Sequence, residues 1–287
     1  MHNLVRSTSL AMLISLGAAG AFAQAQPASP PGGYEPSVGQ EGKDVVWVPT
    51  PQALVDKMLA MAKVTPGDYL IDLGSGDGRT VITAAKRGVR AMGIEYNPEM
   101  VDLSKRNAQK EGLGDKVNFV KADLFESDFS KATVITMFLL DRINLQLRPR
   151  LLDLKPGTRL VSNTFTMGEW NADEKVYANE KEGCTNYCVA HLWIVPAKVA
   201  GTWKLPQGEL TLKQEFQMLT GQLKTGDKVV PVTGRIRGET ATFKAGGNEY
   251  SARVNGSRME GAGKGGAWTA ARLPRSAPAP VPVPAKT

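Results

Sequence analysis

Three glycines at alternate positions follow an apolar run that contains an acidic residue. The run is Tyr-Leu-Ile-Asp-Leu at residues 69–73, and the turn after it is Gly74-Ser75-Gly76-Asp77-Gly78-Arg79. Because glycine has no Cβ and tolerates positive φ, such a turn lets the backbone approach a ligand closely. The apolar run predicts a buried strand, and residues 80–87 predict a helix. This order of strand, turn and helix predicts a ligand-binding site at the end of the strand.

The spacing and charge of the turn indicate which ligand it binds. The dinucleotide fingerprint G-x-G-x-x-G seats a pyrophosphate, whereas this turn reads G-x-G-x-G and has Asp72 two residues before its first glycine. A carboxylate there disfavours a phosphate and favours a cation. S-adenosylmethionine carries a sulfonium and an ammonium but no phosphate. The chain also lacks the G-K-[ST] of a P-loop. The charges therefore favour S-adenosylmethionine over NAD or ATP.

Two further acids stand at the ends of the next two predicted strands. Glu95 ends the run at residues 89–95, where a carboxylate can accept hydrogen bonds from both hydroxyls of a ribose. Asp123 follows the run at residues 116–121 and can accept a hydrogen bond from an adenine amino group. An alternative is that these acids cap helices or pair with Arg79 and Lys121. The ordered set of acids together with the glycines favours the cofactor site.

With these motifs the chain resembles the class I S-adenosylmethionine-dependent methyltransferases. More narrowly, Val48-Pro49-Thr50-Pro51 and residues 72–79 resemble the protein lysine methyltransferases that modify the ATP synthase c-subunit and the adenine nucleotide translocase. The resemblance spans about residues 45–170. It implies a Rossmann-like α/β sheet with flanking helices and methyl transfer to a nitrogen, on a protein lysine or a small molecule.

The candidate cofactor contacts combine the charge argument with this resemblance, in which Pro49 and Thr50 close over the cofactor. They are Pro49, Thr50, Asp72, Gly74, Ser75, Gly76, Asp77, Gly78, Glu95 and Asp123. The chain departs from the family in an export signal and an additional basic domain, so the family's acceptors are not carried over.

The acceptor side is expected after the fourth strand. Residues 133–138 predict this strand and lead into Phe138-Leu139-Leu140-Asp141, without the Asn/Asp-Pro-Pro-Tyr/Phe element typical of adenine or glutamine methylation. Phe138 and Leu139 fit an apolar slot for a lysine stem, or they are simply core; Trp170 is a further candidate wall. Because methyl transfer depends mainly on the alignment and desolvation of the acceptor nitrogen, the sequence predicts no general base. Asp141 fits either a base or a helix cap.

The chain divides into segments of different composition and charge. Of its 287 residues, 42% are apolar, which indicates a globular protein. Residues 201–287 hold 13 Lys and Arg against 6 Asp and Glu, so they carry the whole net charge of +7. We expect the α/β methyltransferase domain over residues 44–197 and a basic antiparallel β domain over residues 198–275. Two His and two Cys predict no metal site.

The β domain shows alternating polar and apolar residues between glycine-containing turns, which predicts a small barrel or sandwich. Trp203 and Trp268, near its two ends, are expected to pack together and close it. Its charge fits an acidic polymer, an anionic lipid surface or a protein acceptor, or else a solvated surface. No specific nucleic-acid recognition is predicted. The runner-up function is a non-catalytic exported binding protein in which this domain recognises the partner.

Both ends of the chain read as non-catalytic segments. Residues 1–23 predict a signal peptide with Ala21-Phe22-Ala23 before the cleavage point, so the mature protein is expected to be exported, periplasmic or secreted, without a transmembrane span. Residues 24–43 predict a disordered lead-in, and residues 276–287 a proline-rich tail.

Cys184 and Cys188 form a candidate disulfide. Two residues four apart on a straight strand lie ~13 Å apart, beyond bridging reach, so a bond requires a turn at residues 183–187. His191 lies in an apolar run and is expected to be packed rather than to act as a ligand.

Overall fold

The computed structural model describes residues 33–263 and 266–274. The predicted signal peptide and the proline-rich tail lie outside the described residues. Within the described ranges, no helix is both long and apolar enough to cross a membrane.

The alternating strands and helices of the first domain form a seven-stranded sheet in the order β3-β2-β1-β4-β5-β7-β6. The strands are β1 (Tyr69–Leu73), β2 (Arg90–Glu95), β3 (Val117–Lys121), β4 (Val134–Met137), β5 (Arg159–Asn163), β6 (Glu174–Tyr177) and β7 (Val189–Ile194). The first five are parallel, whereas β7 pairs antiparallel with both β5 and β6. The strand order reverses between β1 and β4, which is where open α/β sheets bind ligands.

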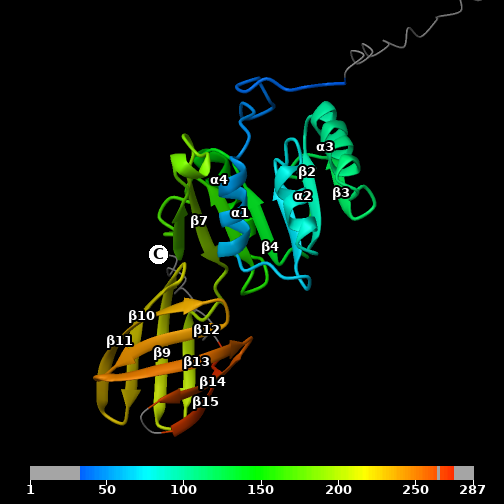
Figure 1. The fold of residues 1–287 in the computed structure, drawn as a ribbon. Helices are drawn as coiled ribbons and strands as arrows, with labels where there is room; N and C mark the ends of the chain where they lie inside the picture. Colours follow the sequence, from blue (N-terminus) through cyan, green and yellow to red (C-terminus); the bar gives the residue numbers. More distant parts are fainter. Residues whose placement is uncertain (1–32, 264–265, 275–287) are drawn as a thin grey trace, which may run out of the picture. The chain divides into compact units, whose positions relative to one another are not determined.

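Four helices cover the two faces of this sheet (Figure 1). They are α1 (Gln52–Met61), α2 (Arg79–Lys86), α3 (Pro98–Lys110) and α4 (Asp141–Leu152). Leu70 and Val134 pack on the side of α1, α2 and α3, whereas Ile71 and Ile135 pack on the side of α4. This alternation follows from the period of two along a strand, because both faces are buried. The helix α3 begins where the Asn97 side chain accepts the Glu99 N–H at 2.9 Å.

The second domain is a closed antiparallel barrel of eight strands. They are β8 (Gly201–Leu205), β9 (Gly208–Glu215), β10 (Met218–Thr225), β11 (Lys228–Arg237), β12 (Thr240–Ala245), β13 (Asn248–Asn255), β14 (Arg258–Gly263) and β15 (Gly266–Arg272). Inward-facing residues such as Leu210, Ile236 and Met259 are fully buried in its core.

Trp203 and Trp268, which the sequence predicted to pack together and close the barrel, both lie in the barrel core. Backbone pairing of β15 with β8 closes it, with Arg272 opposite Trp203. The Arg272 guanidinium lies 4.5 Å from the Trp203 ring centroid. The Trp268 ring packs edge-on against Phe243 and Tyr250, and it covers Gly261 of the neighbouring strand β14, where a Cβ would lie 2.4 Å from the ring.

The sheet and the barrel belong to one compact unit that begins at Tyr34. The Trp170 ring stacks on Phe216 of the barrel, with ring centroids 6.0 Å apart. Gln217 Nε2 donates to the Asn171 carbonyl at 2.7 Å. Trp170 is fully buried here, so its prediction as a wall of the acceptor pocket is wrong; it packs between the sheet core and the barrel instead.

Candidate active site

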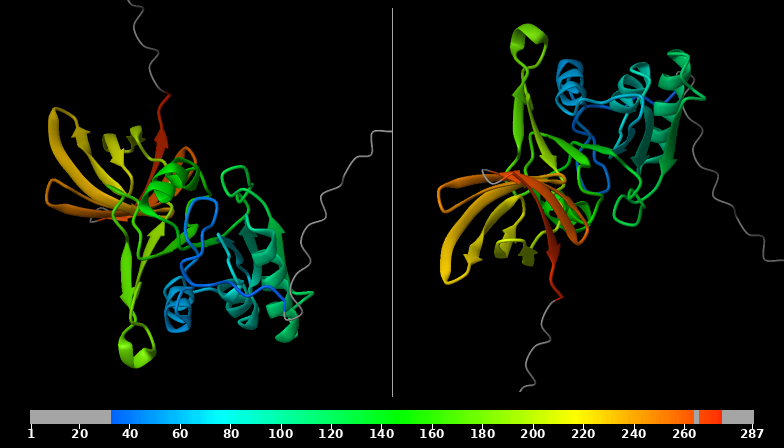
Figure 2. Two further views of the ribbon diagram at one scale, coloured as in Figure 1. Left: turned by 90° about the horizontal axis from the view of Figure 1, so that it is seen from above. Right: turned by 90° about the horizontal axis from the view of Figure 1, so that it is seen from below.

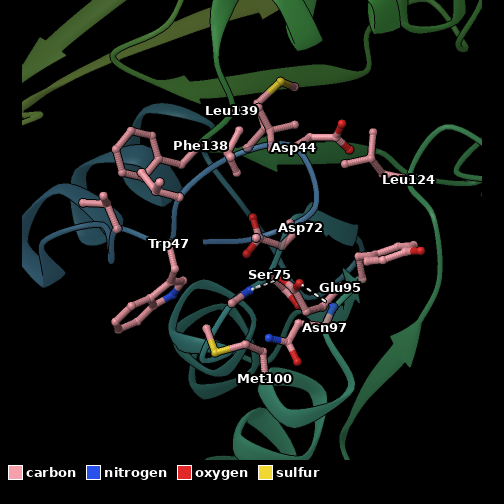
Figure 3. A pocket seen from close by; sticks show the side chains of 18 of the residues that line it. Asp44, Trp47, Asp72, Ser75, Glu95, Asn97, Met100, Leu124, Phe138 and Leu139 are labelled. Carbon is pink, nitrogen blue, oxygen red and sulfur yellow. Dashed lines mark hydrogen bonds between the residues drawn. The ribbon is translucent and has the colours of Figure 1, made fainter. Parts of the chain in front are cut away.

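A pocket of about 380 Å³ lies at the carboxyl ends of β1, β2 and β4 (Figure 3). Its volume is within the range of about 300–1,000 Å³ that small-molecule sites occupy. The predicted residues that line it are Pro49, Thr50, Asp72, Gly74, Ser75, Gly76, Asp77, Glu95, Asp123, Phe138 and Leu139. Gly78 and Trp170 do not line it.

The glycines after β1 are required by the backbone geometry. Gly74, Gly76 and Gly78 have φ values of +74°, +53° and +83°. A Cβ on Gly76 would lie 2.8 Å from Trp47 Nε1, so a side chain here would displace the indole. A Cβ on Gly78 would lie 2.8 Å from the Phe119 ring, which shows why this glycine serves the packing of the turn on β3 rather than the pocket.

Glu95 holds the turn and the start of α3 in place. Its Oε2 accepts the Gly76 N–H and its Oε1 accepts the Asn97 N–H, each at 2.9 Å. A carboxylate oxygen can accept a second hydrogen bond, so both oxygens retain capacity for a pair of hydroxyls. This donor and acceptor arrangement fits a ribose.

Asp72 is the buried acid of the site, with 6% of its surface exposed. Burial, together with the charges of Asp77 and Glu95, raises its pKa to about 7, although Thr136 donates a hydrogen bond to it at 2.6 Å. The ionised form of a buried carboxylate is unfavourable without a partner, and a nearby cation stabilises it. The pocket therefore favours a cation beside Asp72.

Ser75 lines the pocket, but its hydroxyl does not face the open space. Its Oγ is buried beside Gly93, where a Cβ would lie 2.4 Å away, and has no hydrogen-bond partner in the described part of the chain. The signs of the ligand are therefore the acids and the glycine turn, which fit S-adenosylmethionine, and the chain's own Asp72, Glu95 and turn backbone would hold it.

The segment before α1 covers the pocket, including residues 40–43 that the sequence had placed in a disordered lead-in. Trp47 exchanges backbone hydrogen bonds with Gly39 and Gln40 at 2.8 and 2.9 Å, which folds the segment back on itself. This fold places Lys43 in an ion pair with Asp123, and its Nζ lies 4.7 Å from the Tyr96 ring centroid. The Lys43 hydrogen bond lowers the pKa of Asp123.

Pro49 and Thr50 are tied to the glycine turn through polar contacts of Thr50. Arg79 Nη1 donates to the Thr50 carbonyl at 2.8 Å while the same guanidinium pairs with Asp77 at 2.6 Å. The Thr50 hydroxyl accepts from Asn163 Nδ2 at 3.2 Å. Arg79, which follows the third glycine, therefore links the Val-Pro-Thr-Pro element to the glycine turn.

Three aromatic rings gather at the other end of the pocket. Phe138 follows β4, Phe165 follows β5, and Tyr187 precedes β7. Their ring centroids lie 5.2 to 6.3 Å apart. In Figure 3, Phe138 and Leu139 lie on one side of Asp72, and Glu95 with Asn97 on the other.

Sequence reasoning identified Phe138 but not Phe165 or Tyr187. It also missed further pocket-lining residues: Lys43, Asp44, Trp47, Asn97, Met100 and Tyr96. The aromatic Trp47 directly before Val-Pro-Thr-Pro was a usable signal. Phe165 follows the fifth predicted strand, so its place at the same edge of the sheet was a usable signal, whereas nothing in the sequence near Tyr187 marked that residue.

Asp141 and His191 both act on the loop that carries Phe165. Asp141 is the first residue of α4, and its Oδ1 accepts the N–H and hydroxyl of Thr166 at 2.6 and 2.9 Å. His191 Nε2 lies 3.1 Å from the Thr164 carbonyl, and burial lowers the pKa of the ring. Neither residue lines the pocket, so both support the loop from outside it.

The structure contains a Cys184–Cys188 disulfide. The chain turns between the two cysteines, so their Cα atoms are 5.8 Å apart rather than at the spacing of a straight strand. The bond closes a loop at the tip of the β6–β7 hairpin, which Figure 2 shows extending beyond the sheet.

Comparison with known proteins identifies relatives of the first domain. The family model of the ANTKMT methyltransferase domain matches residues 72–174. The chain is 43% identical over 154 residues to a protein-lysine N-methyltransferase of Saccharolobus islandicus, covering 53% of this chain and 94% of the relative. It is 34% identical over 128 residues to the human lysine N-methyltransferase of the ATP synthase c-subunit, covering 44% of this chain and 54% of the relative. The chain thus spans nearly the whole length of the Saccharolobus islandicus relative and about half of the human one.

Among solved structures, the chain is similar to a crystal structure described as an RNA methyltransferase from Salinibacter ruber in complex with S-adenosyl-L-homocysteine. The two are 45% identical with a TM-score of 0.49, and the match covers 53% of this chain and 96% of the other.

Proposed function

The chain belongs to the class I S-adenosylmethionine-dependent methyltransferases, and from this we propose that it methylates the side-chain nitrogen of a lysine in a protein. The two sequence relatives described above carry lysine methyltransferase names. The observation that carries the proposal is the continuity of one pocket from the acid-lined glycine turn to an aromatic wall. No finding favours the non-catalytic alternative.

The residues of the pocket promote this reaction mainly by orienting the cofactor and the acceptor. When bound, S-adenosylmethionine supplies a methyl group on a positively charged sulfur. Asp72 and Glu95 fix its orientation, and Phe138 and Leu139 exclude water from the acceptor. The lysine nitrogen needs a free lone pair, so its ammonium must release a proton to solvent before the transfer. The lone pair then forms the bond to the methyl carbon, while the carbon–sulfur electron pair stays on sulfur.

The test is methyl transfer from labelled S-adenosylmethionine into proteins and RNA of the native host. Complete acid hydrolysis of labelled protein should release methylated lysine, and the Asp72→Ala variant should incorporate little label. The Asp102→Ala variant, on the exposed side of α3, is the matched control and should retain activity. Label that appears in RNA and not in lysine would overturn the proposal.

We also propose that the protein acts after export. The signal peptide at residues 1–23 is a sequence prediction, and the disulfide supports it because such bonds persist mainly in oxidising compartments. Protein from the native host should begin at or near Gln24. Recovery of soluble cytosolic protein with an intact Met1 or His2 end would contradict export.

A further proposal concerns the barrel, which we expect to attract an acidic acceptor. Four arginines of the barrel are less available to attract such an acceptor, because each already forms an ion pair. The pairs are Arg235 with Asp173, Arg237 with Glu174, Arg253 with Glu239 and Arg258 with Glu260. Among the described residues, the exposed Lys213, Lys224 and Lys228 have no ion-pair partner. These three lysines are therefore the candidates for steering an acidic protein.

Reversing the three lysines to Glu should raise the KM for an acidic protein acceptor and reduce its dependence on salt, while affinity for S-adenosylhomocysteine stays unchanged. The matched control reverses three exposed lysines of the first domain: Lys105, Lys110 and Lys116. Equal effects of the two triple variants would show that the barrel charge has no specific role.

A further inference from the structure

The three rings at the acceptor end come from three different connections of the sheet. Phe138 and Phe165 stack with centroids 5.9 Å apart and planes inclined by 29°. Tyr187 meets Phe138 edge-on at 5.2 Å and inclined by 63°. All three rings line the same pocket, and they are inclined to one another rather than forming one flat stack. Ring faces carry partial negative charge and attract cations, most strongly where water is excluded.

Tyr187 differs from the other two rings in how it is held. It is 44% exposed, has a φ of +55°, and is the residue before Cys188. No backbone N–H of residues 185–187 donates a hydrogen bond within the described chain. The position of the Tyr187 ring therefore depends on the two cysteines that flank this stretch.

Both cysteines, in contrast, are hydrogen-bonded to the residues that directly follow β6. Cys184 N donates to the Asn179 carbonyl at 3.1 Å, and Ala178 N donates to the Cys188 carbonyl at 2.9 Å. The Glu182 carboxylate pairs with Lys57 of α1 at 2.8 Å, which ties the loop to the helix. Cys184 is buried in the core on the same side of the sheet as α1. The disulfide thus connects the exposed stretch that carries Tyr187 to a fixed frame.

We propose that Phe138, Phe165 and Tyr187 form the binding site for the cationic side-chain nitrogen of the acceptor, and that the Cys184–Cys188 disulfide completes this site by holding Tyr187 against the other rings. The inference rests on the proposed methylation of lysine and specifies which residues recognise the acceptor. A methylated lysine nitrogen stays positively charged but is larger and less hydrated than an ammonium. The site should therefore bind methylated lysine as well as the unmodified side chain.

Direct binding tests this proposal without requiring methyl transfer. The probe is Nα-acetyl-Nε-trimethyl-lysine methylamide, titrated by calorimetry into the full mature chain saturated with S-adenosylhomocysteine. The comparison probe replaces the trimethylammonium with an uncharged tert-butyl group of the same shape. The native protein should bind the charged probe about tenfold more tightly than the neutral one, which is within the range for a partly exposed cation–π site.

Variants of Tyr187 assign this preference to the ring. The Tyr187→Leu variant should lose most of the preference, and Tyr187→Phe should retain it. Tyr177→Leu is the matched control, because Tyr177 is an exposed tyrosine of β6 that does not line the pocket. Equal binding of the two probes by the native protein, or an unchanged preference in Tyr187→Leu, would overturn the proposal.

Reduction separates the role of the disulfide from that of the ring. A phosphine reductant should lower the affinity of the native protein for the charged probe about as much as Tyr187→Leu does. It should cause little further loss in the Tyr187→Leu background, because two changes that act through one contact are not additive. An equal further loss in that background would refute the role of the disulfide. Unchanged affinity for S-adenosylhomocysteine after reduction serves as the check that the fold is intact.

The outcomes also separate this inference from the proposed function. A protein that prefers the charged probe but methylates no lysine would refute the proposed function alone. A protein that methylates lysine without preferring the charged probe would refute the inference alone.

Discussion

Replacing Asp72 by Asn should stabilise the protein at neutral and alkaline pH while weakening its hold on the cofactor. Asp72 is buried, and burial raises the pKa of its carboxyl from 3.8 to about 7. The folded protein therefore keeps a proton that the unfolded chain loses near pH 4. The stabilising contribution of this proton is complete below about pH 4 and is lost as the pH rises to about 7. Asn keeps the Oδ1 that accepts from Thr136 but carries no charge to bury.

The magnitude follows from the size of the pKa change. A rise from 3.8 to about 7 corresponds to about 4 kcal/mol, because each pH unit is worth about 1.4 kcal/mol. This is an upper limit for Asp72→Asn, since the amide adds donors that need partners. We expect a gain of about 2 kcal/mol or more at pH 8 and little change at pH 4.

Urea denaturation of the cofactor-free protein at pH 4 and pH 8 measures this effect. Asp68→Asn is the control with the opposite sign. Burial also raises the pKa of Asp68, but hydrogen bonds from Thr133, Thr65 and Arg159 lower it below its usual value. Its contribution to stability is therefore present at neutral pH and lost in acid, so Asp68→Asn should destabilise the protein at pH 8. If Asp72→Asn also destabilises the protein at pH 8, the assignment of a costly buried carboxylate is wrong.

Three further predictions follow from the pocket and its supports. Gly76→Ala should abolish cofactor binding measured by calorimetry. The control Gly112→Ala has a positive φ of +67° but no atom near the added Cβ, so it should only cost about 1 kcal/mol of stability. Equal loss of binding in both variants would contradict the steric argument. Trp170→Ala should lower the free energy of unfolding by about 3–5 kcal/mol in urea without changing cofactor affinity of the folded protein; a selective loss of acceptor binding would return Trp170 to the pocket. Lys43→Ala frees Asp123, so cofactor affinity should rise at low salt and converge with the native value at high salt; a fall at low salt would show that Lys43 itself holds the ligand.

The cofactor end of the site was largely predictable because its signals are local. The glycines act through backbone conformations within one turn, and the acids stand at ends of strands that the apolar runs identify. Parallel strands bring their carboxyl ends to one edge, so sequence order alone placed Asp72, Glu95 and Asp123 together. Gly78 was grouped with the others because spacing cannot tell a glycine that faces a ligand from one that faces Phe119.

The sequence by itself determined the class of fold, the glycine turn and the chemistry that its acids select, since each depends on residues close together in the chain. Only the tertiary structure decided what surrounds the acceptor. Phe138, Phe165 and Tyr187 meet because β4, β5 and β7 are neighbours in the sheet, and no local pattern encodes that adjacency. The same holds for Trp170, whose partner Phe216 belongs to the barrel. When the pairing of distant strands brings side chains together, long-range packing fixes their positions. The residues next to each side chain in the sequence therefore do not predict the contact.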